Sequence, residues 1–404
     1  MRRTRRIVQF GFLALTVVGV FVLRGNAERW CPLGGVEALY GYVADGDMLC
    51  SLGITNFYIL GAVLLMTLLV RRAFCAYMCP LGTISEWLRA AGARLGIPAL
   101  RVPAAVDRLL GLLKYAVLAA ILYFTWRAGE LLFRAYDPCY ALLSRHGADI
   151  TFWAYVVAAG IGVSSLAVAI PFCRWLCPFA AVLNPFSSMA VGRVQRDPTA
   201  CRDCRRCAEA CPVAIPVDRL VQVTAARCLA CMNCVEVCPE RTPQGLSFGP
   251  PPWMGRRWPQ AVVVALVLLC TAGAVSAAYL YPLPSYVRTR GTPPDRVATL
   301  RMRIENLTCR GRANLLHWFL QRDDLDQISG YLKLEAWPGP GLAQVQVTYD
   351  PAQTSEDQIH RAIVEPYFNL ADERWWDSPF RIEGYHPLAG LGEADPSPGA
   401  ATAP

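Results

Sequence analysis

Two groups of cysteines near the middle of the chain have the same spacing. Each group reads C-x2-C-x2-C-x3-C-P. Four soft thiolates at this spacing are the ligands of a [4Fe–4S] cluster, and in two-cluster segments the fourth cysteine of each run ligates the other cluster. The runs therefore predict two clusters and a segment that carries electrons. The cysteines are Cys201, Cys204, Cys207 and Cys211 in the first run, and Cys228, Cys231, Cys234 and Cys238 in the second.

The exchange of fourth ligands divides the eight cysteines between two sites. Structural zinc and disulfides are the alternatives. Zinc sites usually take their Cys or His ligands in two pairs, and this pattern explains the repeated four-cysteine run and its proline poorly. Cluster I is predicted to bind Cys201, Cys204, Cys207 and Cys238, and cluster II is predicted to bind Cys228, Cys231, Cys234 and Cys211.

Two further cysteine pairs share the pattern C-x3-C-P, each after an apolar segment. Cys75 and Cys79 form the first pair, and Cys173 and Cys177 form the second. The spacing places both sulfurs on one face of a helical turn, and the proline marks the end of that turn. Packing of cysteine as a small apolar residue explains two matching pairs poorly. Two functions stay open for these pairs, a further four-thiolate cluster and a redox-active dithiol site.

The composition indicates which elements hold these cysteines. Of the 404 residues, 54% are hydrophobic and 17% are charged, and the mean hydropathy is +0.30. This is too apolar for an ordinary soluble protein. A bilayer core requires roughly 20 apolar residues per helix. Five segments approach this length, at 7–23, 52–70, 108–126, 152–172 and 260–281.

Basic residues orient the predicted spans. Arg71 and Arg72 end the second span, whereas 24–51 and 127–151 contain few arginines. The positive-inside rule then places the N-terminus and the cluster segment in the bacterial cytoplasm and the C-terminus in the periplasm. A reducing cytoplasm also suits free thiolates. The expected divisions are a four-helix membrane domain (1–197), a ferredoxin domain (198–250), a fifth transmembrane helix (258–282), a periplasmic domain (296–385) and a disordered tail (387–404).

The predicted outer loops contain cysteines of their own. The sequence C-P-L-G begins at both Cys31 and Cys79, Cys50 ends the first outer loop, and Cys139 lies in the other. A Cys31–Cys50 disulfide in an oxidising periplasm is one alternative. The other is a thiol-based electron exit or a partner contact that uses Cys31 and Cys139. All four histidines fall outside the predicted spans, which excludes a bis-histidine haem within the bilayer.

After the fifth span, the hydrophobic pattern becomes that of a small α+β domain. The predicted order βαββαβ is ferredoxin-like in topology and needs no iron. The expected fold class is thus an α-helical membrane protein with about five transmembrane helices, a dicluster ferredoxin segment and a C-terminal α+β domain. Its strands are expected at 298–306, 328–336, 342–349 and 380–384, and its helices at 309–321 and 354–365.

The combination of two C-x3-C-P pairs with two ferredoxin runs resembles the NapH/NosR family of membrane polyferredoxins. It also resembles the FixG/CcoG group of oxidase-assembly proteins, and the resemblance covers residues 1 to 281. NapH-type relatives imply electron transfer from quinol towards periplasmic reductases. NosR-type relatives imply service to the copper enzyme that reduces nitrous oxide, and CcoG-type relatives imply copper handling. The chain departs from these types in its outer domain and lacks the flavin domain of the NosR type.

The outer segment resembles a heavy-metal-associated domain in degenerate form. The resemblance rests on the stretch 300–304 that leads to Cys309 and on the stretch 345–349 before the second predicted helix. The metal loop of that family needs two cysteines spaced C-x2-C, and Arg312 stands in the second place here. A single thiolate beside a cation is a poor clamp for a soft metal. Cys309 is the one candidate metal ligand of this segment, and the alternative, which the missing second cysteine favours, is a partner-docking or degenerate module.

Together these features predict a membrane-bound iron–sulfur protein that relays electrons between a quinol or cytoplasmic donor and a periplasmic reductase or partner. The alternative is an assembly or maturation factor that supplies reducing equivalents or handles copper for a metalloenzyme. A redox-sensing scaffold is a third class. No dinucleotide or ATP motif occurs, so we expect an electron-transfer subunit rather than a stand-alone enzyme. Expected partners are membrane lipids, redox proteins on both sides and quinol, and no nucleic acid, because the net charge of +8 lies largely beside apolar spans.

Overall fold

The structure is a computed structural model that divides into two compact units. The described residues up to Pro282 form the first unit, and those from Pro284 onward form the second. The predicted disordered tail, 387–404, lies outside the described residues, as does Cys50. The structure describes residues 2–22, 31–36, 39, 55–128, 136–143, 150–239, 245–251, 257–282, 284, 286–291, 296–322, 328–339, 341–369 and 373–385.

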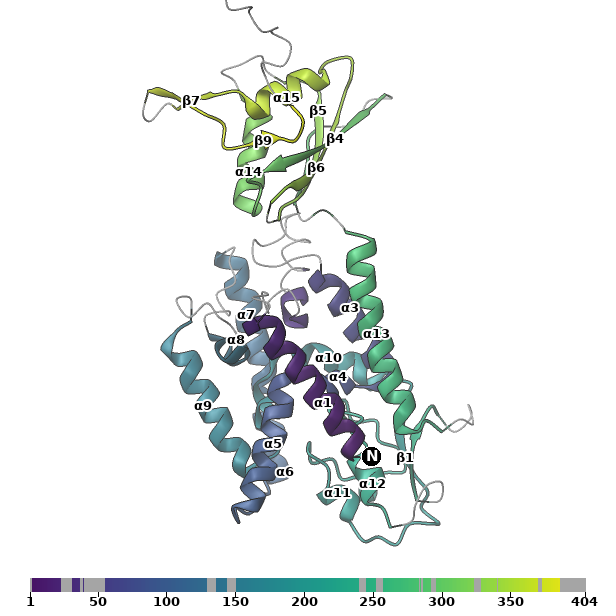
Figure 1. Ribbon diagram of the computed structural model, residues 1–404. Coiled ribbons are helices and arrows are strands. Elements are labelled where there is room, and N and C mark those ends of the chain that lie inside the picture. The colour runs from purple at the N-terminus through teal and green to yellow at the C-terminus, as the bar shows by residue number, and fades with distance from the viewer. Residues whose placement is uncertain are drawn as a thin grey trace, which may run out of the picture. The chain divides into compact units, whose positions relative to one another are not determined.

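The first unit is built mainly from helices (Figure 1). α3 packs against α13, α5 against α9, and α7 against α10. Buried apolar side chains such as Val63, Met66 and Val263 form the core between these helices. The elements are α1 (Arg2–Val17), η1 (Val18–Val22), α3 (Thr55–Val70), α4 (Ala73–Tyr77), α5 (Pro80–Arg94), α6 (Ala104–Leu110), α7 (Leu113–Ala128), α8 (Pro138–Leu143), α9 (Phe152–Ala167), η5 (Phe172–Leu176), α10 (Pro178–Ser188) and α13 (Gln260–Leu280).

Among the described residues, two helices have the length and apolar composition to cross a membrane. They are Arg3–Val22 and Gln260–Leu280. The apolar helices Thr55–Val70 and Phe152–Ala167 are shorter. Helices thus occur at these four predicted spans, while five membrane crossings stay a prediction.

Two predicted spans are wrong in their extent. The segment 108–126 is not one helix, because α6 ends at Leu110 with Gly111 as its C-cap and α7 begins at Leu113. The segment 152–172 is broken after α9, because Val168 is extended and Ile170 has a φ of 43°. Both breaks lie next to residues of the candidate sites. The first places Asp107 just before α7, and the second precedes the C-x3-C-P sequence at 173–178.

The two cysteine runs lie, in the sequence, between the two strands of a small antiparallel sheet. In this sheet β1 pairs with β2, with Arg193 opposite Gly249. A short helix begins just before the third cysteine of each run, and α11 packs against α12. The elements of this segment are β1 (Arg193–Arg196), α11 (Arg206–Glu209), η6 (Val217–Arg219), α12 (Asn233–Val237) and β2 (Leu246–Gly249).

The second unit contains a five-stranded antiparallel sheet in the order β3-β5-β6-β4-β9, with two helices. Strand β4 alternates exposed and buried residues, which gives the sheet one buried face. The sequence did not predict the edge strand β3 or the hairpin β7–β8. The elements are β3 (Tyr286–Thr289), β4 (Ala298–Glu305), α14 (Arg310–Phe319), β5 (Tyr331–Trp337), β6 (Ala343–Tyr349), α15 (Glu356–Val364), β7 (Tyr367–Asn369), β8 (Arg374–Trp376) and β9 (Arg381–Ile382).

Candidate iron–sulfur sites

The two ferredoxin-type cysteine runs have the same backbone shape. In the first run Asp203 and Arg205 have φ angles of 49° and 58°, and in the second the equivalent Ala230 and Met232 have φ angles of 50° and 59°. Left-handed backbone at non-glycine residues costs energy and concentrates at functional sites. Two such turns in quick succession curl each loop tightly. This shape suits thiols that converge on one small volume.

The four cysteines predicted for cluster I line a single pocket. Arginine side chains share the lining, among them Arg196, Arg202 and Arg205. Cys204 is exposed whereas Cys207 is buried, so the pocket lies at the surface of the unit. We call this set quartet I, and it consists of Cys201, Cys204, Cys207 and Cys238.

The four cysteines predicted for cluster II lie deeper in the unit. Their thiols interact electrostatically in every pairwise combination. Burial raises the pKa of the Cys231 thiol to about 12 and raises the pKa of Cys234 well above its usual value. A bare thiolate is therefore unfavourable here, and a cationic iron core fits the donor set. This quartet II consists of Cys211, Cys228, Cys231 and Cys234.

The two C-x3-C-P pairs come together in the structure. Cys79 and Cys177 are the N-caps of α5 and α10, with matching backbone angles of φ −64°, ψ 119° and φ −63°, ψ 113°. The proline after each of them begins a new helix as well as ending the preceding turn, because its fixed φ suits the first helical position. The four thiols interact electrostatically in every pairwise combination. This quartet III consists of Cys75, Cys79, Cys173 and Cys177.

Buried arginine atoms near quartets II and III provide a second test of cofactor fit. Within the described residues, six buried side-chain nitrogen or oxygen atoms lack a hydrogen-bond partner, and three are the Nε atoms of Arg5, Arg72 and Arg174. Arg5 interacts with the Cys231 thiol, Arg72 interacts with the thiols of Cys173 and Cys177, and Arg174 lies in the second C-x3-C-P sequence. Buried donors normally find acceptors. Thiolates and sulfides of a bound cluster are suitable acceptors.

A [4Fe–4S] cluster needs a different arrangement of ligands from a single metal ion. In the described part of the chain, no three His, Cys, Asp or Glu side chains lie close enough to hold one ion. A [4Fe–4S] cluster instead presents a separate iron to each of four thiolates. The convergence of four thiols in each quartet, with cations around them, therefore fits a cluster.

Two arginines that the sequence suggested as topology markers are among the largest fully buried side chains. Arg71 is 0% exposed and donates to the carbonyl oxygens of Gly192, Val223 and Ala225 at 3.0, 2.6 and 3.0 Å. Arg72 is 1% exposed, and its backbone N–H donates to the Cys228 carbonyl at 3.4 Å. The pair therefore attaches the end of α3 to the loop that leads into quartet II. No local sequence signal separates them from a solvated basic flank.

The remaining cysteines have separate surroundings. The Cys139 thiol interacts electrostatically with those of Cys31, Cys79 and Cys177, so it lies near quartet III. The Cys31 carbonyl accepts a hydrogen bond from Asn56 Nδ2 at 2.9 Å. The alternative pairing of Cys31 with Cys50 falls outside the described residues. Cys309 lies in the second unit as the half-exposed N-cap of α14.

Comparison with protein families identifies the cofactor. Residues 52–98 and 150–196, which contain the two C-x3-C-P sequences, each match a 4Fe-4S binding domain. Residues 193–239 match a 4Fe-4S dicluster domain. The chain therefore binds [4Fe–4S] clusters. No solved structure matches it.

Three curated relatives share the same region. YccM of Escherichia coli K12, whose name assigns it to electron transport, is 32% identical over 50% of this chain and 58% of its own length. The regulatory protein NosR of Pseudomonas aeruginosa is 28% identical over 35% of this chain and 20% of its own. The ferredoxin-type protein NapH of Haemophilus influenzae is 28% identical over 52% and 74%. The matches thus span less than two thirds of YccM and NosR. In its two 4Fe-4S binding segments and its dicluster domain, the chain is thus similar to polyferredoxins of the NapH/NosR type.

Proposed function

We propose that the chain is a membrane-bound iron–sulfur protein that relays electrons between partner molecules. The observation that carries the proposal is the convergence of quartets II and III on one hydrophobic core, next to the surface pocket of quartet I. Quartets I and II hold clusters I and II, and quartet III holds a third [4Fe–4S] cluster rather than a redox dithiol. Each cluster supplies one-electron transfer when bound. The family match of both C-x3-C-P segments supports the third assignment.

The proposal includes an orientation in the bacterial inner membrane. The ferredoxin domain, 198–250, lies in the cytoplasm, and the domain at 296–385 lies in the periplasm. The apolar helices α1 with η1 and α13 support membrane insertion by their length and composition. Electrons then pass between a cytoplasmic donor or quinol and a periplasmic reductase or other partner.

Quartet I is the proposed docking point for a soluble donor. Its Cys204 is exposed, and Arg202 and Arg205 line the same pocket. A basic rim raises the encounter rate with an acidic partner, and salt screens this effect. We expect the double variant Arg202→Glu/Arg205→Glu to reduce the second-order rate constant for reduction by an acidic soluble ferredoxin about tenfold at low ionic strength. Stopped-flow reduction of the full chain measures this constant.

The control variant is Arg301→Glu/Arg303→Glu, which makes the same charge change on the exposed face of β4 in the second unit. It is expected to leave the rate constant unchanged. The difference between the pocket variant and the wild type should shrink as salt is added. Equal rate constants at every ionic strength would show that a soluble acidic donor does not enter at quartet I and would favour quinol as the donor.

A second function, maturation of a copper enzyme, requires a copper ligand, and Cys309 is the candidate in the second unit. Cys309 is half-exposed at the N-terminus of α14, a short turn after β4 ends at Glu305. A single thiol with no second cysteine in its loop is a weak copper ligand. We therefore expect Cys309→Ser to bind as much Cu(I) per full-length chain as the wild type in a competition titration. Loss of one Cu(I) per chain in this variant would support the maturation function instead.

A further inference from the structure

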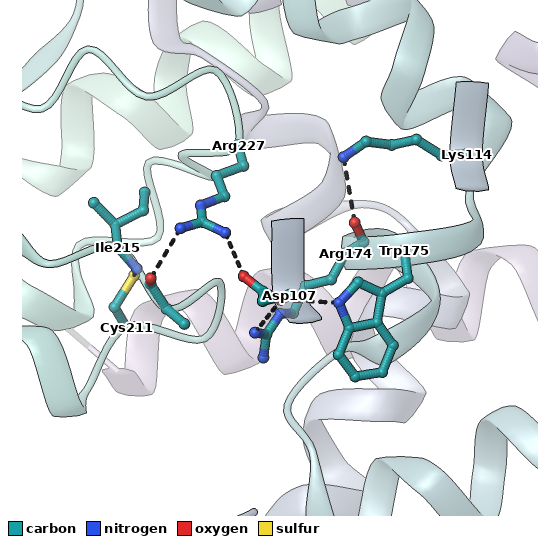
Figure 2. A network of polar contacts seen from close by, with 8 residues as sticks. Asp107, Lys114, Arg174, Trp175, Cys211, Ile215 and Arg227 are labelled. Atoms are coloured by element: carbon teal, nitrogen blue, oxygen red, sulfur yellow. Dashed lines mark hydrogen bonds and ion pairs between the residues drawn. The ribbon is translucent and has the colours of Figure 1, made fainter. Parts of the chain in front are cut away.

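One buried carboxylate connects the second C-x3-C-P sequence to the ferredoxin segment. Asp107, on α6, is 6% exposed and binds three donors from two other segments (Figure 2). Arg174 Nη2 and Trp175 Nε1 lie 2.5 and 2.8 Å from Oδ1, and Arg227 Nη1 lies 2.6 Å from Oδ2. Burial alone would raise the pKa of Asp107, but the Trp175 hydrogen bond and the Arg174 charge outweigh it and lower that pKa. The group is therefore a carboxylate.

The first two donors lie in the loop that carries two cysteines of quartet III. Arg174 and Trp175 lie between Cys173 and Cys177 in the second C-x3-C-P sequence. Arg174 is 7% exposed, and its Nε has no partner among the described residues. Its carbonyl accepts a hydrogen bond from Lys114 Nζ at 3.2 Å, which fixes the loop from the side of α7 (Figure 2). Asp107 thus holds a cation inside the loop that carries two thiols of quartet III.

The third donor lies next to a cysteine of quartet II. Arg227 directly precedes Cys228, and its Nη2 donates to the Ala214 carbonyl at 3.0 Å. The next residue, Ile215, donates its backbone N–H to Cys211 Sγ at 3.4 Å (Figure 2). Asp107 is therefore connected, through Arg227 and its hydrogen bond to Ala214, to both sequence regions that supply quartet II.

The charge balance of this group is uneven. One carboxylate faces two guanidinium groups, so the set keeps one net positive charge between the two quartets. Removing one partner of a buried ion pair leaves the other charge uncompensated. The net charge and hydrogen bonds around an iron–sulfur cluster help to set its reduction potential. A change at Asp107 should therefore change the reduction potentials of the centres at both quartets.

We propose that Asp107 is a positioning residue that couples the reduction potentials of the centres at quartets II and III. Its carboxylate holds Arg174 beside one quartet and Arg227 beside the other, and it offsets part of their charge. This inference rests on the proposed cluster at quartet III. No nearby sequence pattern marks it, because Asp107 and Arg227 are separated by 120 positions in the chain.

The test is an EPR-monitored redox titration of the full-length Asp107→Asn protein. The amide keeps the size of the side chain but removes its charge, so the buried Arg174 and the partly exposed Arg227 both lose their compensating charge. More positive surroundings favour the reduced cluster, and the potentials of the centres at quartets II and III should both rise. The potential at quartet I should not change.

Two further variants separate coupling from a structural effect. Arg227→Gln removes a cation that is 34% exposed, and it should lower the potential at quartet II while leaving Asp107 paired with Arg174. Glu86→Gln is the matched control. Glu86 pairs with Arg5, which neighbours the Cys231 thiol of quartet II, so this variant should raise the potential at quartet II alone. A purely structural role for Asp107 does not produce shifts of opposite sign in D107N and R227Q.

The outcomes distinguish this inference from the proposed function. A wild-type protein with only two paramagnetic centres would overturn the cluster at quartet III and, with it, the coupling. Three centres whose potentials are the same in wild type and D107N would overturn the coupling alone. If D107N loses its clusters, the potential at quartet II in R227Q becomes the test. An unchanged potential there would also overturn the inference.

Discussion

Anaerobically purified protein is expected to contain about twelve irons per chain, because each of the three quartets binds a four-iron cluster. The double variant Cys75→Ser/Cys173→Ser should contain about eight, because it removes one thiolate from each C-x3-C-P pair and leaves the eight ferredoxin-type ligands intact. The loss should be specific to quartet III, since the two cysteines belong to α4 and η5 and not to either ferredoxin run. Iron analysis with EPR of the reduced protein measures both numbers.

The matched control for this experiment is Cys270→Ser. Cys270 is a half-buried cysteine within α13 and belongs to none of the three quartets. It should keep about twelve irons and all three EPR signals. A wild-type count of about eight that the double variant does not change would make quartet III a thiol or structural site. A count near zero with zinc present would overturn the iron–sulfur interpretation of the whole chain.

The cluster ligands could be predicted because their signal is local and chemically narrow. The spacing of each four-cysteine run contains most of a binding site within one short loop. The structure adds the shape of the two loops, which spacing alone does not give. Each loop has two left-handed residues at equivalent places, Asp203 and Arg205 in the first and Ala230 and Met232 in the second. The convergence of Cys75 and Cys79 with Cys173 and Cys177 was left open by the sequence, because nothing local relates segments almost a hundred positions apart.

The polar surroundings of the sites could not be predicted for a different reason. Arginines after an apolar helix are the usual mark of a cytoplasmic flank, and Arg71 and Arg72 have that pattern while being fully buried. Asp107 stands near the start of an apolar segment with no motif around it. Its partners come from two distant loops, so only the folded chain identifies it. The predicted extent of two helices was also wrong, since α6 ends at Gly111 and the backbone of Ile170 is left-handed within continuous apolar sequence.

Replacement of Arg71 by alanine is expected to destabilise the first unit strongly. The side chain donates to three backbone carbonyls at 2.6 to 3.0 Å and is 0% exposed, so alanine leaves buried acceptors without donors. Hydrogen bonds from a charged group contribute about 1.5–3 kcal/mol each, and losses within one network overlap. We therefore expect a loss of about 3 kcal/mol in the free energy of unfolding, with the cluster at quartet II affected first because Val223 and Ala225 precede Cys228.

The rate at which cluster absorbance bleaches in denaturant measures this loss in the detergent-solubilised full chain. If the cost falls on the folded state, about 3 kcal/mol corresponds to about a 100-fold faster loss. Arg71→Lys keeps the charge but not the three-way donor geometry, so its rate should fall between alanine and wild type. Arg94→Ala, an exposed arginine in the last turn of α5, should bleach at the wild-type rate. Equal rates for the Arg71 and Arg94 variants would show that Arg71 is a replaceable basic flank and that the loop before Cys228 is held by other contacts.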